Sequence, residues 1–113
     1  ENQTLSEIGL MPEIISRYRS TYFSHIFAGG YSSGYYSYIW AEVLDSDGYA
    51  YFKETDLFDQ EKAAKLRKHV FAAGNSREPM ELYKQFRGAE PDIDALLQKR
   101  GLNPDPKIDQ VTL

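Results

Sequence analysis

The sequence predicts an all-α fold, built as an irregular segment of several helices. Apolar residues recur three or four positions apart in the segments after residue 31, which is the spacing of a helix face. A serine, an aspartate or a proline stands at the expected start of each segment, and a glycine follows the last three. No useful alternation of apolar and polar residues follows residue 52, so strands are not expected there.

The residues before the long helix predict only short helical pieces. Thr4 and Glu7 have the spacing of a capping box, and Gly9 stands where a short helix would end. Pro12 is suited to open a second helical turn. Residues 21–27 combine β-branched and aromatic side chains, so their pattern does not separate helix from strand.

The longest predicted helix runs from about Ser32 toward Lys53, with Ser32 or Ser33 as its N-cap. Its apolar positions are Tyr36, Ile39, Trp40, Val43 and Leu44. Gly48 would weaken the middle of this helix by about 1 kcal/mol relative to alanine, which allows a break at that point.

Three shorter helices are expected in the second half, each with a residue that starts it and a glycine that ends it. These residues are Asp59 and Gly74, Ser76 and Gly88, and Pro91 and Gly101. The last helix would turn Ile93, Leu96 and Leu97 inward. Residues 103–113 show little periodicity, which predicts an extended or disordered tail after a helical region over residues 1–102.

Composition limits the classes of partner. The chain has 113 residues and no cysteine, which suits one domain and excludes a disulfide or thiolate-metal framework. Its net charge is -4, so the chain lacks the excess of basic residues that proteins use to bind nucleic acid or anionic lipid. Residues 20–41 carry no charge, but their hydroxyl groups and the Gly29-Gly30 pair disfavour a membrane span. We therefore expect no nucleic acid and no membrane among the partners.

The first residue is Glu1, which indicates a processed product or a piece of a longer protein. No basic stretch followed by an apolar one opens the chain, and cysteine is missing. Both features are compatible with the cytoplasm, which we expect as the location, with the periplasm as the alternative.

Tyrosine is the most enriched residue type, with nine copies. Tyr31, Tyr35 and Tyr38 stand at i, i+4 and i+7, so a helix that began just before them would place all three on one stripe. Such a stripe can border a polar cleft, although aromatic stripes more often serve packing. Spacing alone leaves both interpretations open.

The two histidines do not form a metal site by themselves. His25 precedes the glycine pair, and a lone histidine is more often a structural residue than a catalyst. His69 lies among lysines and an arginine, which predicts a solvated helix surface. Neither belongs to a His-Glu-x-x-His pair, so the sequence predicts no zinc site in this chain.

Two long strings resemble the C-terminal part of the thimet oligopeptidase family of zinc metallopeptidases, in particular its bacterial oligopeptidases and peptidyl-dipeptidases. They are FSHIFAGGYSSGYYSYIWAEVLDSDGYAYF at residues 23–52 and GNSREPMELYKQFRGAEPDIDALLQKRGL at residues 74–102. The resemblance implies an almost wholly helical fold and hydrolysis of short peptides. It also implies zinc ligands and a catalytic glutamate upstream of the region seen here, so the expected partner is the remainder of a peptidase chain.

The resemblance further implies site residues in this chain. His25, Tyr31 and Tyr38 would be catalytic, and Tyr35, Gly29 and Gly30 would bind substrate. A neutral phenol is a suitable donor to the oxyanion that forms during peptide hydrolysis. One of the two glycines is expected to adopt backbone angles that are costly for other residues, or to pass close to substrate.

Two other interpretations stay open at this point. One is a helical peptide-binding module without catalysis, and the other is a structural helical domain whose aromatic residues are only core. The first interpretation, a C-terminal piece without its metal centre, predicts that the isolated chain is inactive. The sequence does not separate dipeptide release from oligopeptidase activity.

Overall fold

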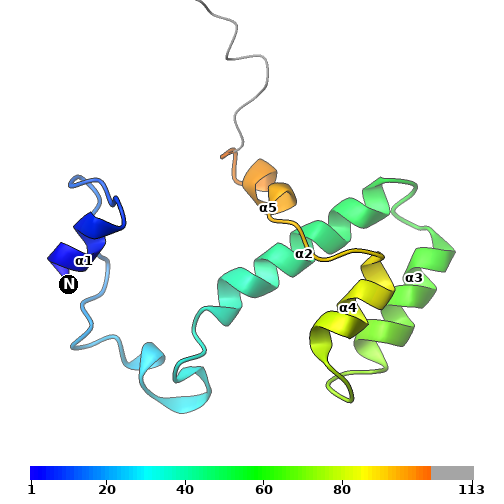
Figure 1. The fold of residues 1–113 in the computed structure, drawn as a ribbon, viewed down its shortest axis with the longest axis horizontal. Helices are drawn as coiled ribbons and strands as arrows, with labels where there is room; N and C mark the ends of the chain where they lie inside the picture. Colours follow the sequence, from blue (N-terminus) through cyan, green and yellow to red (C-terminus); the bar gives the residue numbers. More distant parts are fainter. Residues whose placement is uncertain (103–113) are drawn as a thin grey trace, which may run out of the picture. The chain divides into compact units, whose positions relative to one another are not determined.

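The computed structural model describes residues 1–102 (Figure 1). Within this range the regular elements are all helical, which confirms the predicted all-α class. The chain divides into two compact units, Glu1–Tyr36 and a second that starts at Ser37. The tail predicted over residues 103–113 lies outside the described residues.

The first unit contains one α-helix and two 3-10 turns. Helix α1 spans Asn2–Glu7, and the turns span Ser24–Ile26 and Gly29–Tyr31. The N-cap of α1 is Glu1, so Thr4 lies inside the helix and the predicted capping box is wrong. Gly9 follows the helix with φ +83, a left-handed conformation that ends helices at low cost.

Pro12 does not open a regular helix. The backbone there forms a single turn, in which the Ile14 N–H donates to the Met11 carbonyl at 3.0 Å. Ile14 and Ile15 are consequently exposed, because no second turn follows to bring an apolar face against α1.

The second unit is organised around the long helix α2, Ser37–Lys53. This helix begins after the predicted start because Ser33 has φ +56, a value that a right-handed helix does not tolerate. Neither Ser32 nor Ser33 caps it. Gly48 does not break the helix, and a Cβ at that position would lie 3.5 Å from the Phe86 ring, so this position allows close packing of α4.

Helix α3, Gln60–Leu66, has the predicted cap. The Asp59 carboxylate accepts the N–H groups of Glu61 and Lys62 at 2.9 and 3.0 Å. A π-helical turn, Arg67–Phe71, continues α3, and Gly74 with φ +53 follows it as expected.

Helices α4 and α5 start at other residues than predicted. Helix α4 spans Pro79–Arg87, and its cap is Glu78, not Ser76, because the Glu78 side chain accepts the Met80 N–H. Gly88, with φ +85, ends it as predicted. Helix α5 spans Asp94–Lys99, three residues beyond Pro91.

The inward face of α5 agrees with the prediction only in part. Leu96 is 5% exposed, whereas Ile93, which caps the helix, is 55% exposed. Ile93 precedes the first helical turn, so its side chain does not lie on the buried face of α5 that contains Leu96. None of the described helices is long and apolar enough to cross a membrane.

The core of the second unit joins α2, α4 and α5. Its buried apolar side chains are Val43, Leu82, Tyr83, Phe86 and Leu96. The Phe86 ring packs edge-on against Tyr51 of α2, with centroids 5.4 Å apart.

A carboxylate lies inside this core. Asp47 is 2% exposed and accepts the Tyr83 hydroxyl at 2.6 Å and the Arg87 Nε at 3.2 Å. Burial, followed by the hydrogen bond to Asp47, raises the pKa of the Tyr83 phenol. Arg87 also pairs with Glu54 at 3.0 Å. Both donors belong to α4, whereas Asp47 lies on α2 and Glu54 directly follows that helix, so these bonds hold α4 against α2.

Helix α3 joins the same cluster through Lys62, which is buried. Its ammonium group donates to the Tyr51 carbonyl and lies 4.0 Å from the centroid of the Tyr51 ring. It also pairs with Glu54 at 3.8 Å. The buried lysine is therefore compensated by a carbonyl, an aromatic face and a carboxylate.

We expect Asp47→Ala to lower the free energy of unfolding by about 2 to 4 kcal/mol, because Tyr83 and Arg87 would lose their buried acceptor. Urea unfolding followed by circular dichroism measures this. Asp45→Ala is the matched control, since Asp45 is an exposed carboxylate on the same helix and should cost less than about 0.5 kcal/mol. Equal losses in the two variants would contradict the role given to Asp47.

Candidate functional site

Three of the predicted site residues lie together in the first unit. The His25 ring centroid is 5.3 Å from that of Tyr31 and 5.9 Å from that of Tyr35. The two tyrosine rings are 6.5 Å apart and meet edge to face. We call His25, Tyr31 and Tyr35 the ring cluster.

The backbone forms the ring cluster by tight turns, not by a continuous helix. Gly29 has φ +68 and starts the 3-10 turn that carries Tyr31. After that turn the Gly34 N–H donates to the Tyr31 carbonyl at 2.9 Å, and Ser33 has φ +56. The predicted stripe on one helix is therefore wrong, because Tyr31 and Tyr35 precede α2.

The two glycines differ. Gly29 has a left-handed backbone that other residues rarely adopt, whereas Gly30 does not. A Cβ at either position would meet no described atom within 4 Å. Conformation, and not space, is therefore the reason for glycine at Gly29, and the expectation of costly angles holds for Gly29 alone.

A second layer of aromatic rings supports Tyr35. Phe23 meets the Tyr35 ring edge-on at 5.0 Å, and Tyr18 stacks on Phe23 at 5.1 Å. These supporting residues were not predicted from the sequence, although the aromatic density over residues 18–23 was a signal for them. Tyr31 and Tyr35 remain 36% and 38% exposed, so a ligand can reach them.

Tyr38 belongs to the second unit. It is the second residue of α2 and is 49% exposed. A position in the first turn gives the side chain a rigid helical support, which suits a group that must hold a fixed hydrogen-bonding geometry.

His69 was predicted to lie on a solvated helix surface, and the structure differs from this prediction. It lies in the π-helical turn, is partly buried, and its Nδ1 is enclosed without a hydrogen-bond partner among the described residues. His25 and His69 belong to different units. In the described part of the chain, no three His, Cys, Asp or Glu side chains are grouped as a metal site requires, so these residues do not fit a zinc centre.

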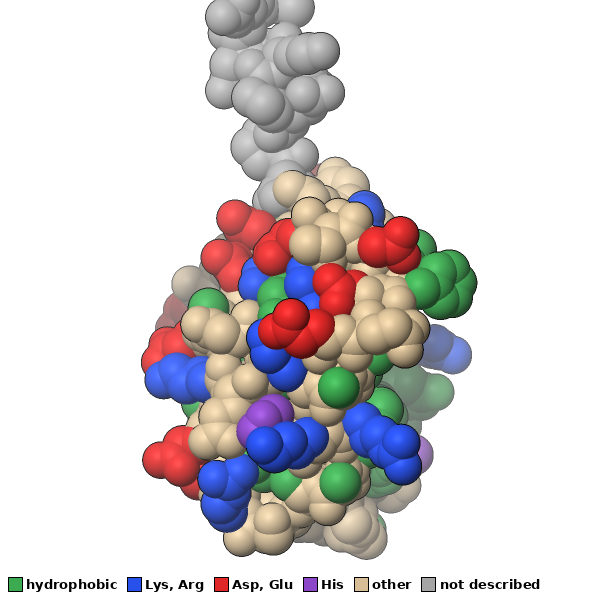
Figure 2. All heavy atoms as spheres, turned by 90° about the vertical axis from the view of Figure 1, so that its right-hand side faces the viewer, with side chains coloured by type: hydrophobic (Ala, Val, Ile, Leu, Met, Phe, Trp, Pro, Cys, Tyr) green, Lys and Arg blue, Asp and Glu red, His purple; other side chains and the backbone are tan. Residues whose placement is uncertain are grey.

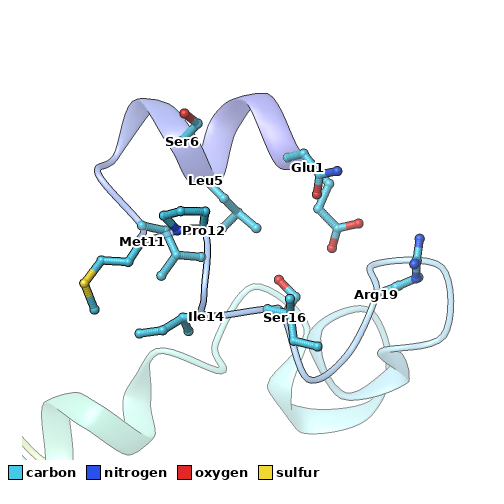
Figure 3. A pocket seen from close by; sticks show the side chains of 11 residues that line it. Glu1, Leu5, Ser6, Met11, Pro12, Ile14, Ser16 and Arg19 are labelled. Carbon is cyan, nitrogen blue, oxygen red and sulfur yellow. The ribbon is translucent and has the colours of Figure 1, made fainter.

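The first unit also contains a cavity of about 640 Å³, formed by α1 and the segment after it (Figure 3). Leu5, Met11, Pro12 and Ile14 give it an apolar lining, with Glu1 and Arg19 at one side. None of the predicted site residues lines this cavity. The candidate site is thus the exposed ring cluster and not the cavity.

Comparison with known proteins identifies the family. Peptidase family M3 matches residues 1–102. The dipeptidyl carboxypeptidase of Escherichia coli K12 is 46% identical over 93 residues, which cover 82% of this chain and 14% of the relative. The corresponding Salmonella typhimurium enzyme is 45% identical over 104 residues, covering 91% of this chain and 15% of the relative.

A further relative is the oligopeptidase A of Salmonella typhimurium, 51% identical over 80 residues, or 71% of this chain and 12% of the relative. The chain thus spans about one-seventh of the length of the curated relatives it matches. These matches confirm the resemblance seen in residues 23–52 and 74–102. Because the family match extends over the whole described range, the chain belongs to peptidase family M3.

Proposed function

We propose that this chain is the C-terminal segment of a zinc metallopeptidase that hydrolyses short peptides, as a peptidyl-dipeptidase or an oligopeptidase. The observation that carries the proposal is the ring cluster, which groups His25 with Tyr31 and Tyr35 on an exposed surface. The relatives are named dipeptidyl carboxypeptidase and oligopeptidase A, which supports a peptide substrate.

In this proposal the phenols act as hydrogen-bond donors. Tyr31 and Tyr38 would donate to the oxyanion that develops on the carbonyl of the scissile peptide bond, and His25 would hydrogen-bond substrate beside Tyr31. Tyr35 and the backbone at Gly29 and Gly30 would contact the peptide itself. A preorganised donor of this kind contributes about 3 to 4 kcal/mol in the transition state, where the negative charge is greatest.

The proposal places the zinc ligands elsewhere, in the remainder of the peptidase polypeptide. Residues 1–102 contain no group of side chains that fits a metal centre, and the two histidines lie in separate units. The isolated chain would then bind peptides weakly at most and would not cleave them. We further infer a cytoplasmic location, which the name of an Arabidopsis thaliana relative, probable cytosolic oligopeptidase A, supports.

A helical peptide-binding module without catalysis is the alternative. Its supporting observation is the exposure of Tyr31 and Tyr35, because tyrosine rings with accessible hydroxyls are common in binding surfaces. Kinetic measurements separate the peptidase from the binding module. Removal of a group that binds substrate and transition state equally raises KM and leaves kcat unchanged.

The test uses a chimaera in which residues 1–102 replace the matching segment of the Salmonella typhimurium dipeptidyl carboxypeptidase. We expect Tyr38→Phe to lower kcat about 100- to 1000-fold and to change KM less than about threefold, because the lost hydroxyl acts mainly in the transition state. Tyr49→Phe, on the same helix, is the control and should keep full turnover. A raised KM with unchanged kcat in Tyr38→Phe would favour the binding module.

Gly29→Val should lower kcat/KM of the chimaera at least about tenfold, since a residue with a β-carbon costs 1 kcal/mol or more at φ +68 and would displace Tyr31. Gly30→Val should lower it much less, because Gly30 is not left-handed. Zinc content and the helical circular dichroism signal should persist in both. The opposite order would mean that a side chain at position 30 blocks the substrate and that the backbone strain at Gly29 does not limit cleavage.

The isolated 113-residue chain should hold no stoichiometric zinc after chelation and reloading. Atomic absorption on the dialysed protein measures the metal content. One tightly bound zinc ion per chain would show that the metal centre lies within this chain, against the proposal.

A further inference from the structure

The segment over residues 18–36 is rich in aromatic rings. Its tyrosine and phenylalanine residues are Tyr18, Tyr22, Phe23, Phe27, Tyr31, Tyr35 and Tyr36. The ring cluster contains two of these tyrosines, and the proposed function assigns no role to the other rings. Among the others, Phe23 contacts a member of the cluster, because its ring centroid lies 5.0 Å from that of Tyr35.

The face that α3 and α4 form has a different composition. Lysine, arginine and carboxylate side chains are interspersed over it (Figure 2). Ion pairs such as Lys65 with Glu61 at 2.9 Å and Lys84 with Glu90 at 2.6 Å satisfy these charges. Such pairs are typical of a solvated surface, whereas grouped and partly exposed rings are typical of a binding surface.

The backbone holds Phe23 on both sides. The Phe23 N–H donates to the Arg19 carbonyl at 3.1 Å, and the Phe23 carbonyl accepts the Ile26 N–H at 3.2 Å. Phe23 is also the N-cap of the 3-10 turn Ser24–Ile26, which carries His25. One short turn therefore determines where both the Phe23 ring and the His25 ring lie.

The Tyr35 ring contacts both of these rings. Its centroid lies 5.0 Å from that of Phe23, with 76° between the ring planes, and 5.9 Å from that of His25. An edge-to-face pair at this distance shifts an equilibrium by a factor of about 2 to 12. Tyr35 lies in a run of turns before α2, so no regular helix fixes its side chain.

Phe23 is itself backed by a further ring. Tyr18 stacks on it at 5.1 Å with 28° between the planes, and the Arg17 guanidinium carbon lies 5.4 Å from the Tyr18 centroid. Phe23 is partly buried, and its side chain has no polar atom with which to bind a peptide. Any effect of Phe23 on the reaction must therefore act through the ring that it contacts, which is Tyr35.

We propose that Phe23 is a positioning residue of the peptidase site and keeps the Tyr35 ring in the orientation that binds peptide. This inference rests on the proposed function, in which Tyr35 contacts substrate. Without the Phe23 ring, Tyr35 would populate other rotamers, and the apparent affinity for peptide would fall by the same factor as the competent fraction. Bound peptide selects the competent rotamer, so the turnover of the saturated enzyme is unchanged.

The test uses substitutions of Phe23 in the chimaera with the Salmonella typhimurium dipeptidyl carboxypeptidase. We expect Phe23→Leu to raise KM about three- to tenfold and to change kcat less than about twofold. The inhibition constant of a product-like peptide should rise by the same factor as KM. Phe23→Tyr keeps a ring at this position, so its KM should stay within about twofold of the unsubstituted value.

Tyr22→Leu is the matched control. Tyr22 directly precedes Phe23, is 59% exposed, and pairs with Tyr18 at 6.2 Å. This substitution should leave KM and kcat within about twofold. A KM as high in Tyr22→Leu as in Phe23→Leu would show general loosening of the segment and overturn the inference.

A double-mutant cycle with Tyr35→Leu shows whether Phe23 acts through Tyr35. Tyr35→Leu alone should raise KM at least as much as Phe23→Leu does. Adding Phe23→Leu to it should raise KM less than about 1.5-fold further, because the ring that Phe23 positions is already absent. Effects that multiply in full would overturn the inference, as would a KM in Phe23→Tyr as high as in Phe23→Leu.

Zinc content and circular dichroism check that each chimaera is folded. Phe23→Met repeats the test with less loss of side-chain volume and should raise KM as Phe23→Leu does. An unchanged KM in both variants beside a raised KM in Tyr35→Leu would overturn the inference on Phe23 alone. Failure of the proposed function is recognised separately, by unchanged turnover of the Tyr38→Phe chimaera together with an unchanged KM in Tyr35→Leu.

Discussion

The second unit depends on one buried carboxylate. Asp47 lies inside the core at 2% exposure, where an unpaired charge would be very costly. The Tyr83 hydroxyl and the Arg87 guanidinium supply the hydrogen bonds that water would otherwise give it. Since α2 and α4 are joined by these bonds, the C-terminal half of α2 is anchored and the helix is a fixed support for Tyr38 at its other end.

In the first unit, the backbone conformation positions the ring cluster. Left-handed backbone at Gly29 and Ser33 turns the chain twice within a few residues, and this brings Tyr31 and Tyr35 to the His25 ring. Glycine adopts such angles at little cost, but serine does not, so the turn at Ser33 stores strain. Strain of this kind is commonly kept where side-chain geometry matters more than stability.

Local signals in the sequence predicted some of the helix ends, although the caps expected at Thr4 and Ser76 were wrong. The Asp59 cap and the glycine ends at Gly74 and Gly88 were correct because each depends on a few neighbouring backbone groups. The predicted start of α2 was wrong because helix propensity does not reveal that the backbone at Ser33 is left-handed. The bond between Asp47 and Arg87 joins residues 40 positions apart, and no local pattern predicts such a pair. The site residues were predicted from the family resemblance. Spacing alone placed the three tyrosines on one helix, which is wrong because Tyr31 and Tyr35 precede α2.

The most direct test of the account is the affinity of the Tyr31→Phe chimaera for a phosphinic peptide, which mimics the tetrahedral intermediate of peptide hydrolysis. If Tyr31 in the ring cluster donates to the oxyanion, the variant should bind this inhibitor about 100-fold more weakly. Its affinity for a product-like peptide should fall less than about threefold. Equal weakening of both ligands would show that Tyr31 only binds peptide, and unchanged affinity for both would remove the ring cluster from the active site.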